Sequence, residues 1–117
     1  MQKLASHSDD IVVNNVSHMS RAVEAARRAT AHILAAANEP RRPAVNGVNY
    51  LMLLGRLCGG WMMTRASYKA AVQESAPSAA PSFMLAKLAT ARVFMTHHLP
   101  PVHALAAVIM TGDEGIL

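Results

Sequence analysis

The sequence predicts an all-α protein, folded as an up-and-down helical bundle of three long helices and one shorter C-terminal helix. Composition is the first reason. Hydrophobic residues make up 52% of the chain but aromatic residues only 4%, and eight methionines contribute to the difference. Methionine, alanine and leucine favour helices, whereas sheets depend on branched and aromatic side chains. Periodicity is the second reason, because apolar residues recur at steps of three and four between proline-containing segments.

The first helix is expected over residues 9–38. Ser8, followed by two aspartates, is typical of a helix start, because a hydroxyl caps free amides and carboxylates favour the positive end of the helix dipole. Eight positions then form a seam with a mean spacing of 3.5 residues, in which Thr30 is the one polar residue. The prolines in the segment 40–43 end the helix. The seam consists of Val12, Val16, Met19, Val23, Ala26, Thr30, Ile33 and Ala37.

The second helix is expected over residues 45–73, and its first half is apolar on most sides. Such a helix is central in a bundle or is covered by a partner. Gly55, Gly59 and Gly60 each weaken a helix by about 1 kcal/mol relative to alanine. Their presence therefore predicts a close approach by a neighbouring helix or loop. The single cysteine, Cys58, is expected to be a buried small hydrophobe.

Three neighbours in a small bundle cover only part of a helix that is apolar all round. We therefore expect an interface on the first half of the second helix, and a closed two-fold dimer is the commonest way to cover such a patch. The methionines there also suit a pocket for a lipid-like ligand, although methionine at helical spacing is more often core. The candidate interface residues are Tyr50, Leu53, Leu54, Leu57 and Trp61.

The segment 74–81, rich in serine, alanine and proline, is a linker by composition. Ser82 can cap a third helix that runs to about His98. Pro100 and Pro101 end it, and Pro101 can occupy the first turn of a short final helix. The whole chain, residues 1–117, is therefore expected to form a single helical domain of ordinary size.

Charge and hydropathy exclude two classes of partner. The net charge is +4, but the eleven basic residues are spread along the chain, whereas a nucleic-acid site needs a clustered basic face. The longest apolar stretch, residues 51–63, contains Arg56 and is shorter than the roughly 20 residues that cross a bilayer. We expect neither nucleic acid nor a membrane as a partner. One cysteine and an N-terminus without a signal-peptide core predict a cytoplasmic location.

Motifs for catalysis or metal binding are incomplete. A phosphate-binding loop needs glycines between a strand and a helix, but the glycines of residues 55–60 lie within an expected helix. His97, His98 and His103 are the best metal candidates. However, adjacent residues on a helix point about 100° apart, and two prolines separate this pair from the third histidine. A solvated cationic helix end is the favoured interpretation. We predict no catalytic, cofactor-binding or metal-binding residue.

The second half of the chain carries a series of packing motifs. These motifs are Asn49-Tyr50-Leu51 through Gly55 to Gly60-Trp61-Met62, then Phe83-x3-Lys87-Leu88-Ala89-Thr90-Ala91-Arg92-x-Phe94, then Leu99-Pro100 and Gly112. In their order and spacing they resemble the C-terminal helical extension of one branch of flavin-dependent acyl-CoA dehydrogenases, the branch that includes methylmercaptopropionyl-CoA dehydrogenase-like enzymes. The similarity covers roughly residues 8–117.

This resemblance implies an accessory domain, a fragment of a larger multidomain enzyme in fatty-acid metabolism. Its partners would be the remaining domains of the parent dehydrogenase, with a homo-oligomer expected. The family oxidises acyl-CoA with FAD and a glutamate base, both held in domains upstream of this extension, and no position here matches them. The isolated chain is therefore expected to be inactive and to hold no cofactor. The alternative is an independent helical module that binds a protein or an apolar ligand.

Overall fold

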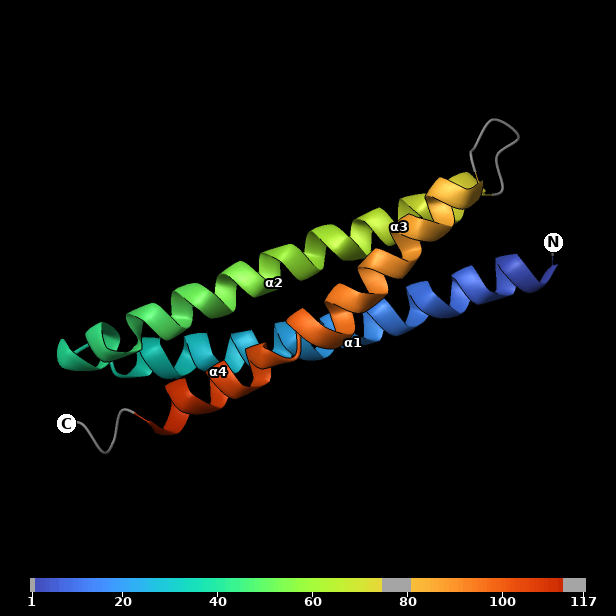
Figure 1. Ribbon diagram of the computed structural model, residues 1–117. Coiled ribbons are helices and arrows are strands. Elements are labelled where there is room, and N and C mark those ends of the chain that lie inside the picture. Colours follow the sequence, from blue (N-terminus) through green and yellow to red (C-terminus); the bar gives the residue numbers. More distant parts are fainter. Residues whose placement is uncertain (1, 75–80, 113–117) are drawn as a thin grey trace.

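The computed structural model describes residues 2–74 and 81–112, which are almost entirely helical and contain no strand. Two long antiparallel helices lie side by side, and a third, bent arm runs back along them (Figure 1). The resulting rod measures 59 × 19 × 18 Å. The predicted all-α, up-and-down bundle is confirmed. In chain order the elements are α1 (Gln2–Ala35), α2 (Arg41–Glu74), α3 (Pro81–Val93), the π-helix η1 (Phe94–His98) and α4 (Pro101–Thr111).

Three helix starts differ from the sequence-based expectation. α1 begins at Gln2, so Ser8 lies within the helix and does not begin it; no proline or glycine in the preceding segment stops the helix earlier. α2 begins at Arg41 and includes Pro43 in its first turn, where a missing N–H breaks no helical hydrogen bond. α3 begins at Pro81 for the same reason, so Ser82 follows the start that it was expected to cap.

The turn between α1 and α2 contains backbone hydrogen bonds and one hydrogen-bonded carboxylate, that of Glu39. The backbone N–H and the Nε of Arg41 donate to Oε1 of Glu39 at 3.3 and 3.1 Å. The side-chain hydrogen bond from Arg41, followed by the backbone one, holds the pKa of Glu39 below its usual value. Both side chains are exposed to solvent, so the pair orients the turn and contributes little to overall stability.

The inner face of α1 consists mainly of alanine, and the predicted seam is only partly right. Met19 and Ala26 are buried as expected, but Val16 and Val23 are exposed. α1 packs against α2 and also against α4, and small side chains let both neighbours approach. The valines lie at the edge of this contact. From residue 10 onward, the buried residues of α1 are Ile11, Asn15, Met19, Ala22, Ala25, Ala26, Ala29 and, just after its end, Ala36.

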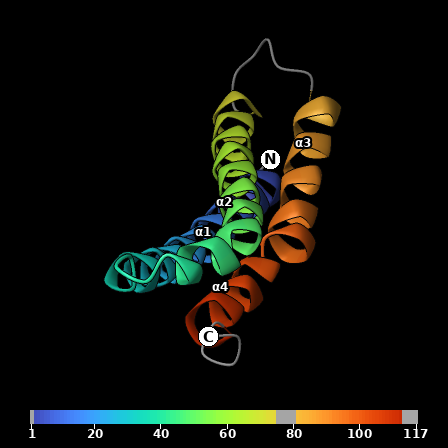
Figure 2. The same cartoon turned by 90° about the vertical axis from the view of Figure 1, so that its left-hand side faces the viewer.

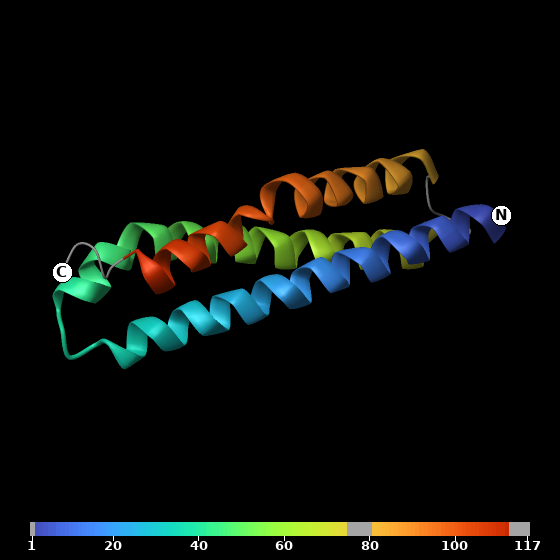
Figure 3. The same ribbon diagram turned by 90° about the horizontal axis from the view of Figure 1, so that it is seen from below.

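The expected third and fourth helices form a single bent arm (Figure 3). The N–H of Leu99 donates to the carbonyl of Phe94 at 3.0 Å, five residues back, which defines the π-turn. Pro100 and Pro101 have no N–H to donate. The N–H of Val102 donates to the carbonyl of Leu99 at 2.9 Å. In a regular α-helix this N–H would donate to the carbonyl of His98, which is therefore left without a helical partner. At the bend, the carbonyl of His98 therefore requires a hydrogen-bond donor from another element.

Arg56 of α2 is that donor. Its Nη1 donates to the carbonyl oxygen of His98 at 2.9 Å. The polar residue that interrupts the apolar half of α2 thus satisfies a carbonyl that is left unpaired because the Val102 N–H bonds to Leu99. On both sides of the bend the arm buries one apolar face in the core, whereas Phe83, Val93 and Val108 are exposed. The buried residues of this face are Leu88, Ala91, Met95, Leu99, Val102, Ala106 and Ile109.

The bent arm also passes a length and composition test for a membrane span. Ser82–Thr111 is long and apolar enough to cross a bilayer, unlike the shorter stretch in residues 51–63. A core helix of a bundle passes the same test, and here the apolar stripe of the arm is buried against α1 and α2. The segment also carries Lys87 and Arg92, both exposed. Burial in the bundle core accounts for only part of its hydropathy, because 28% of the apolar window is buried.

Candidate functional site

The five predicted interface residues of α2 divide between the core and the surface. Leu53 is fully buried in the main core cluster with Met19 and Met95. Tyr50, Leu54 and Leu57 are half-buried and pack against the same cluster. Trp61 is 53% exposed. The structure thus brings four of them together on the inner side of α2, and Trp61 is the one that has most of its surface free for a partner.

Tyr50 explains the polar residue in the seam of α1. The hydroxyl of Thr30 donates to the carbonyl of Ala26 at 2.8 Å and lies 2.7 Å from the hydroxyl of Tyr50. A threonine hydroxyl has one hydrogen, so the Tyr50 hydroxyl donates to Thr30. The interruption is therefore a hydrogen-bonded link between α1 and α2.

The outward side of α2 carries a second apolar surface, which we call the outer stripe. Its apolar residues are exposed, and no charged residue lies among them over about four turns of the helix. A methyl group at Gly55, midway along the stripe, meets no atom within 4 Å. Cys58 is also exposed, so its predicted burial is wrong: it belongs to this stripe and not to the core. The outer stripe consists of Val48, Leu51, Met52, Gly55, Cys58 and Met62.

The predicted close approach is confirmed at two of the three glycines. A methyl group at Gly59 would lie 2.7 Å from Cζ of Phe94, and one at Gly60 would lie 2.8 Å from Cδ1 of Leu99. Both neighbours belong to the bend of the third arm. Side chains of the bend make this approach and pack against α2 at the two glycines, whereas Gly55 faces open space.

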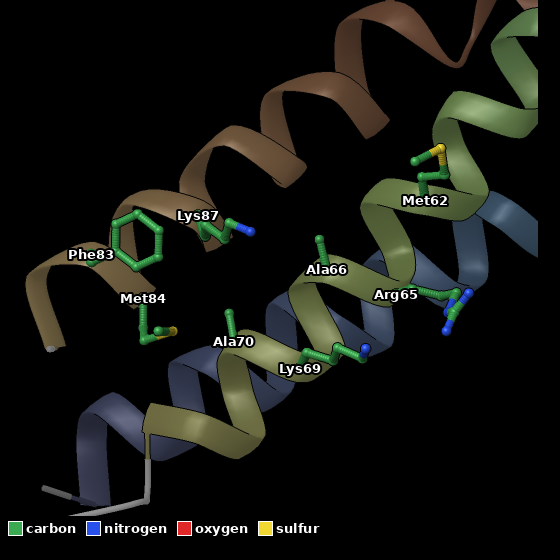
Figure 4. Close-up of a pocket in the computed structure, with 8 residues that line it drawn as sticks. All are labelled: Met62, Arg65, Ala66, Lys69, Ala70, Phe83, Met84 and Lys87. Carbon is green, nitrogen blue, oxygen red and sulfur yellow. The ribbon is translucent and has the colours of Figure 1, made fainter. Parts of the chain in front are cut away.

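The arm stands beside the second half of α2 (Figure 2). A groove lies between α2 and α3 there. Its volume is about 380 Å³. Figure 4 shows Ala66 and Ala70 of α2 facing α3, with Met84 and Lys87 projecting from the opposite side. Sequence reasoning missed this groove because its cations lie far apart in the chain. The lining residues are Met62, Arg65, Ala66, Lys69, Ala70, Phe83, Met84 and Lys87.

The three histidines considered as metal ligands lie on the surface of the arm. His97, His98 and His103 are all exposed, and the ring of His98 packs at 5.5 Å from that of Phe94. Within residues 2–74 and 81–112 no three histidine, cysteine, aspartate or glutamate residues are placed to hold a metal ion. The bend therefore separates the histidines and does not gather them.

The described residues also do not fit a flavin site. Glycine lets a backbone approach a phosphate closely when it lies in a loop at a helix start. Here Gly55, Gly59 and Gly60 lie inside α2, and the last two are covered by the bend of the arm. No step of flavin chemistry is derived from this chain.

These features define an all-helical accessory domain. Part of the apolar surface of the bundle is exposed, and among the described residues no set of side chains is arranged for metal binding. One family description, "Acetyl-CoA dehydrogenase C-terminal like", matches residues 2–117. The chain belongs to this family of acyl-CoA dehydrogenase C-terminal domains. No curated protein and no solved structure matches it. Membership implies further domains in the parent enzyme, an FAD cofactor held there, and oligomerisation.

Proposed function

We propose that this chain is the C-terminal accessory domain of an FAD-dependent acyl-CoA dehydrogenase of the methylmercaptopropionyl-CoA dehydrogenase-like branch. It packs on the remaining domains of the parent and on a second subunit, and it contributes no catalytic residue. The parent acts in cytoplasmic fatty-acid metabolism. Family membership supports the class of enzyme, and the packing motifs of α2 and α3 support the branch.

The outer stripe of α2 is the observation that carries the packing role. Leu51 is 72% exposed and Met62 65% exposed, next to an open Gly55. Exposed apolar surface costs on the order of 25 cal/mol per Å² relative to burial, so a contiguous stripe is expected to have a partner. Glycine at the middle of the stripe lets another helix come close. A docking surface for the parent's other domains explains both features.

Complementation in trans tests the proposal. A dehydrogenase of this branch is expressed without its C-terminal domain, loaded with FAD and mixed with this chain. We expect one complex on size-exclusion chromatography and a higher melting temperature of the flavoprotein. Failure to bind a dehydrogenase of this branch, while binding one from another branch, would contradict the branch assignment. Failure to bind any of them would contradict the accessory role.

Matched variants locate the contact. Leu51→Glu and Met62→Glu place a carboxylate on the outer stripe and should abolish the complex while leaving the helicity of the chain unchanged. Leu34→Glu is the control, because Leu34 is 68% exposed but lies on α1. Equal loss of binding by all three variants would show that the stripe is not the docking surface.

A further inference from the structure

We infer that the groove between α2 and α3 binds an anionic amphipath, that is, an aliphatic chain carrying a phosphate or carboxylate head. The inference does not depend on the parent enzyme, and the groove shares only Met62 with the outer stripe. It rests on three properties of the groove: positive charge at its rim that no described carboxylate pairs with, an apolar lining, and a size that suits a small molecule.

The charge at the rim is entirely positive. Arg65 and Lys69 lie one turn apart on α2, and Lys87 reaches from α3 toward the gap (Figure 4). Residues 41–72 and 82–112 contain no aspartate or glutamate. Among the described side chains, no carboxylate pairs with any of these three cations. A concave surface lined by one sign of charge attracts the opposite sign.

Aromatic rings hold two of the cations in place. The guanidinium of Arg65 lies 4.8 Å from the centre of the Trp61 ring, and Nζ of Lys87 lies 5.8 Å from the centre of the Phe83 ring. Such contacts orient a cation and leave its outer N–H groups free to donate. The two contacts lie one on each helix that borders the groove, and they fix the position of one cation on each side.

The lining below the cations is apolar. Ala66 and Ala70 are small enough to leave space above the backbone of α2, and Met62, Phe83 and Met84 surround that space. Methionine adapts to irregular aliphatic shapes. The volume of about 380 Å³ falls within the range of roughly 300–1,000 Å³ that is usual for small-molecule sites. An inorganic anion would contact only the cations at the rim. An amphipath would contact both the cations and the apolar lining.

A second hollow, on α1, has different chemistry. It has a volume of about 290 Å³ and contains Arg27, but Glu24 lines it too. The two side chains approach to 4.0 Å. The positive charge of that hollow is therefore balanced within it, so it offers no comparable attraction for an anion.

Trp61 provides the measurement, because it is the only tryptophan in the chain and contacts Arg65. Octyl phosphate, below its micelle concentration, is titrated into the purified chain at low salt. We expect saturable quenching of tryptophan fluorescence, weakened by added salt, with helicity unchanged. Inorganic phosphate and octyltrimethylammonium test the head group and the chain separately, and each should bind at least tenfold more weakly, the loss expected when either half of the contacts is missing.

Charge variants make the site specific. Lys69→Gln and Lys87→Gln should each weaken binding of octyl phosphate by about tenfold. Arg92→Gln is the matched control, because it removes an exposed cation of α3 that does not line the groove. An equal effect of all three variants, or equal quenching by the cationic amphipath, would overturn the proposal. So would binding to vesicles of anionic lipid without binding to monomeric octyl phosphate, which indicates a membrane surface and not a groove.

Discussion

The three glycines of α2 show how neighbours decide the effect of one residue type. Gly55 faces open space, Gly59 faces the tip of the half-buried Phe94, and Gly60 faces Leu99, which is buried. Helix propensity favours alanine at each of them by about 1 kcal/mol. Only the space around each added methyl group differs, so the three positions separate propensity from packing.

Alanine substitution at these glycines should give three different results. Gly55→Ala should raise the free energy of unfolding by about 1 kcal/mol. Gly60→Ala should lower it, because overpacking against the buried Leu99 costs about 1–3 kcal/mol. Gly59→Ala should fall between them, since Phe94 can shift. Urea melts of the three variants measure this order, and stabilisation by Gly60→Ala would refute the close approach of the arm.

A buried amide on α1 gives the second residue-level prediction. Asn15 is 1% exposed, and its Nδ2 has no hydrogen-bond partner among the described residues. Leucine has a similar size and carries no such unsatisfied donor, so Asn15→Leu should stabilise the bundle by about 1–3 kcal/mol. Asn14→Leu is the control, because Asn14 is exposed. Thermal melts that show destabilisation by Asn15→Leu alone would mean that the amide has a partner in solution.

The third arm is the element whose form depends most on another element. Pro100 and Pro101 force a break in the hydrogen bonding, and the π-turn before them spreads that break over one turn. The direction of the bend follows from α2, where Gly59 and Gly60 leave room for the side chains of the arm. Arg56 then satisfies the carbonyl of His98. The bend is therefore built jointly by two helices.

Removing the Arg56 side chain should loosen this bend. Arg56→Leu leaves the carbonyl of His98 to water, and we expect a loss of about 1 kcal/mol, at the low end for hydrogen bonds to charged groups because the site is partly open. Amide hydrogen exchange at His103 and neighbouring residues should become faster. Arg28→Leu, on the exposed side of α1, serves as the control. Unchanged exchange in Arg56→Leu would show that the prolines and packing hold the bend unaided.

The whole molecule has more apolar surface than its own bundle covers. The outer stripe remains exposed after three rods have packed together, and a closed two-fold dimer is the commonest way to cover such a surface. We expect the isolated chain to form a dimer at micromolar concentration, measured by sedimentation equilibrium. Leu51→Glu should shift the mass toward monomer and Leu34→Glu should not. A monomer that binds no hydrophobic dye would contradict this expectation.

The chain is also expected to lack activity without the parent's other domains. The described residues offer no flavin-binding loop. Gly55, Gly59 and Gly60 lie inside α2 and not in a turn that could bind a phosphate. We expect neither stoichiometric quenching of FAD fluorescence nor dye reduction with any acyl-CoA. Either signal from the purified chain would show a flavin site that the helical bundle does not reveal.

The sequence by itself determined the helical class, the up-and-down bundle and the close approach at Gly59 and Gly60. Composition and spacing report on local backbone preference, and a bundle of long helices depends mainly on that preference. The sequence predicts helix starts less well. Ser8 and Ser82 are residues that favour a helix start, but a serine does not stop a helix that can begin earlier.

Tertiary structure alone decided which apolar side faces inward. Residues 48–62 of α2 are apolar on both sides, so periodicity could not distinguish Leu53, which is buried, from Cys58, which is exposed. It also decided the groove, because Lys69 and Lys87 come from different helices and meet only when α3 lies beside α2. The physical reason is the same in both cases: local sequence sets the direction of each side chain from its own helix axis, whereas the placement of the neighbouring helices sets what that side chain meets.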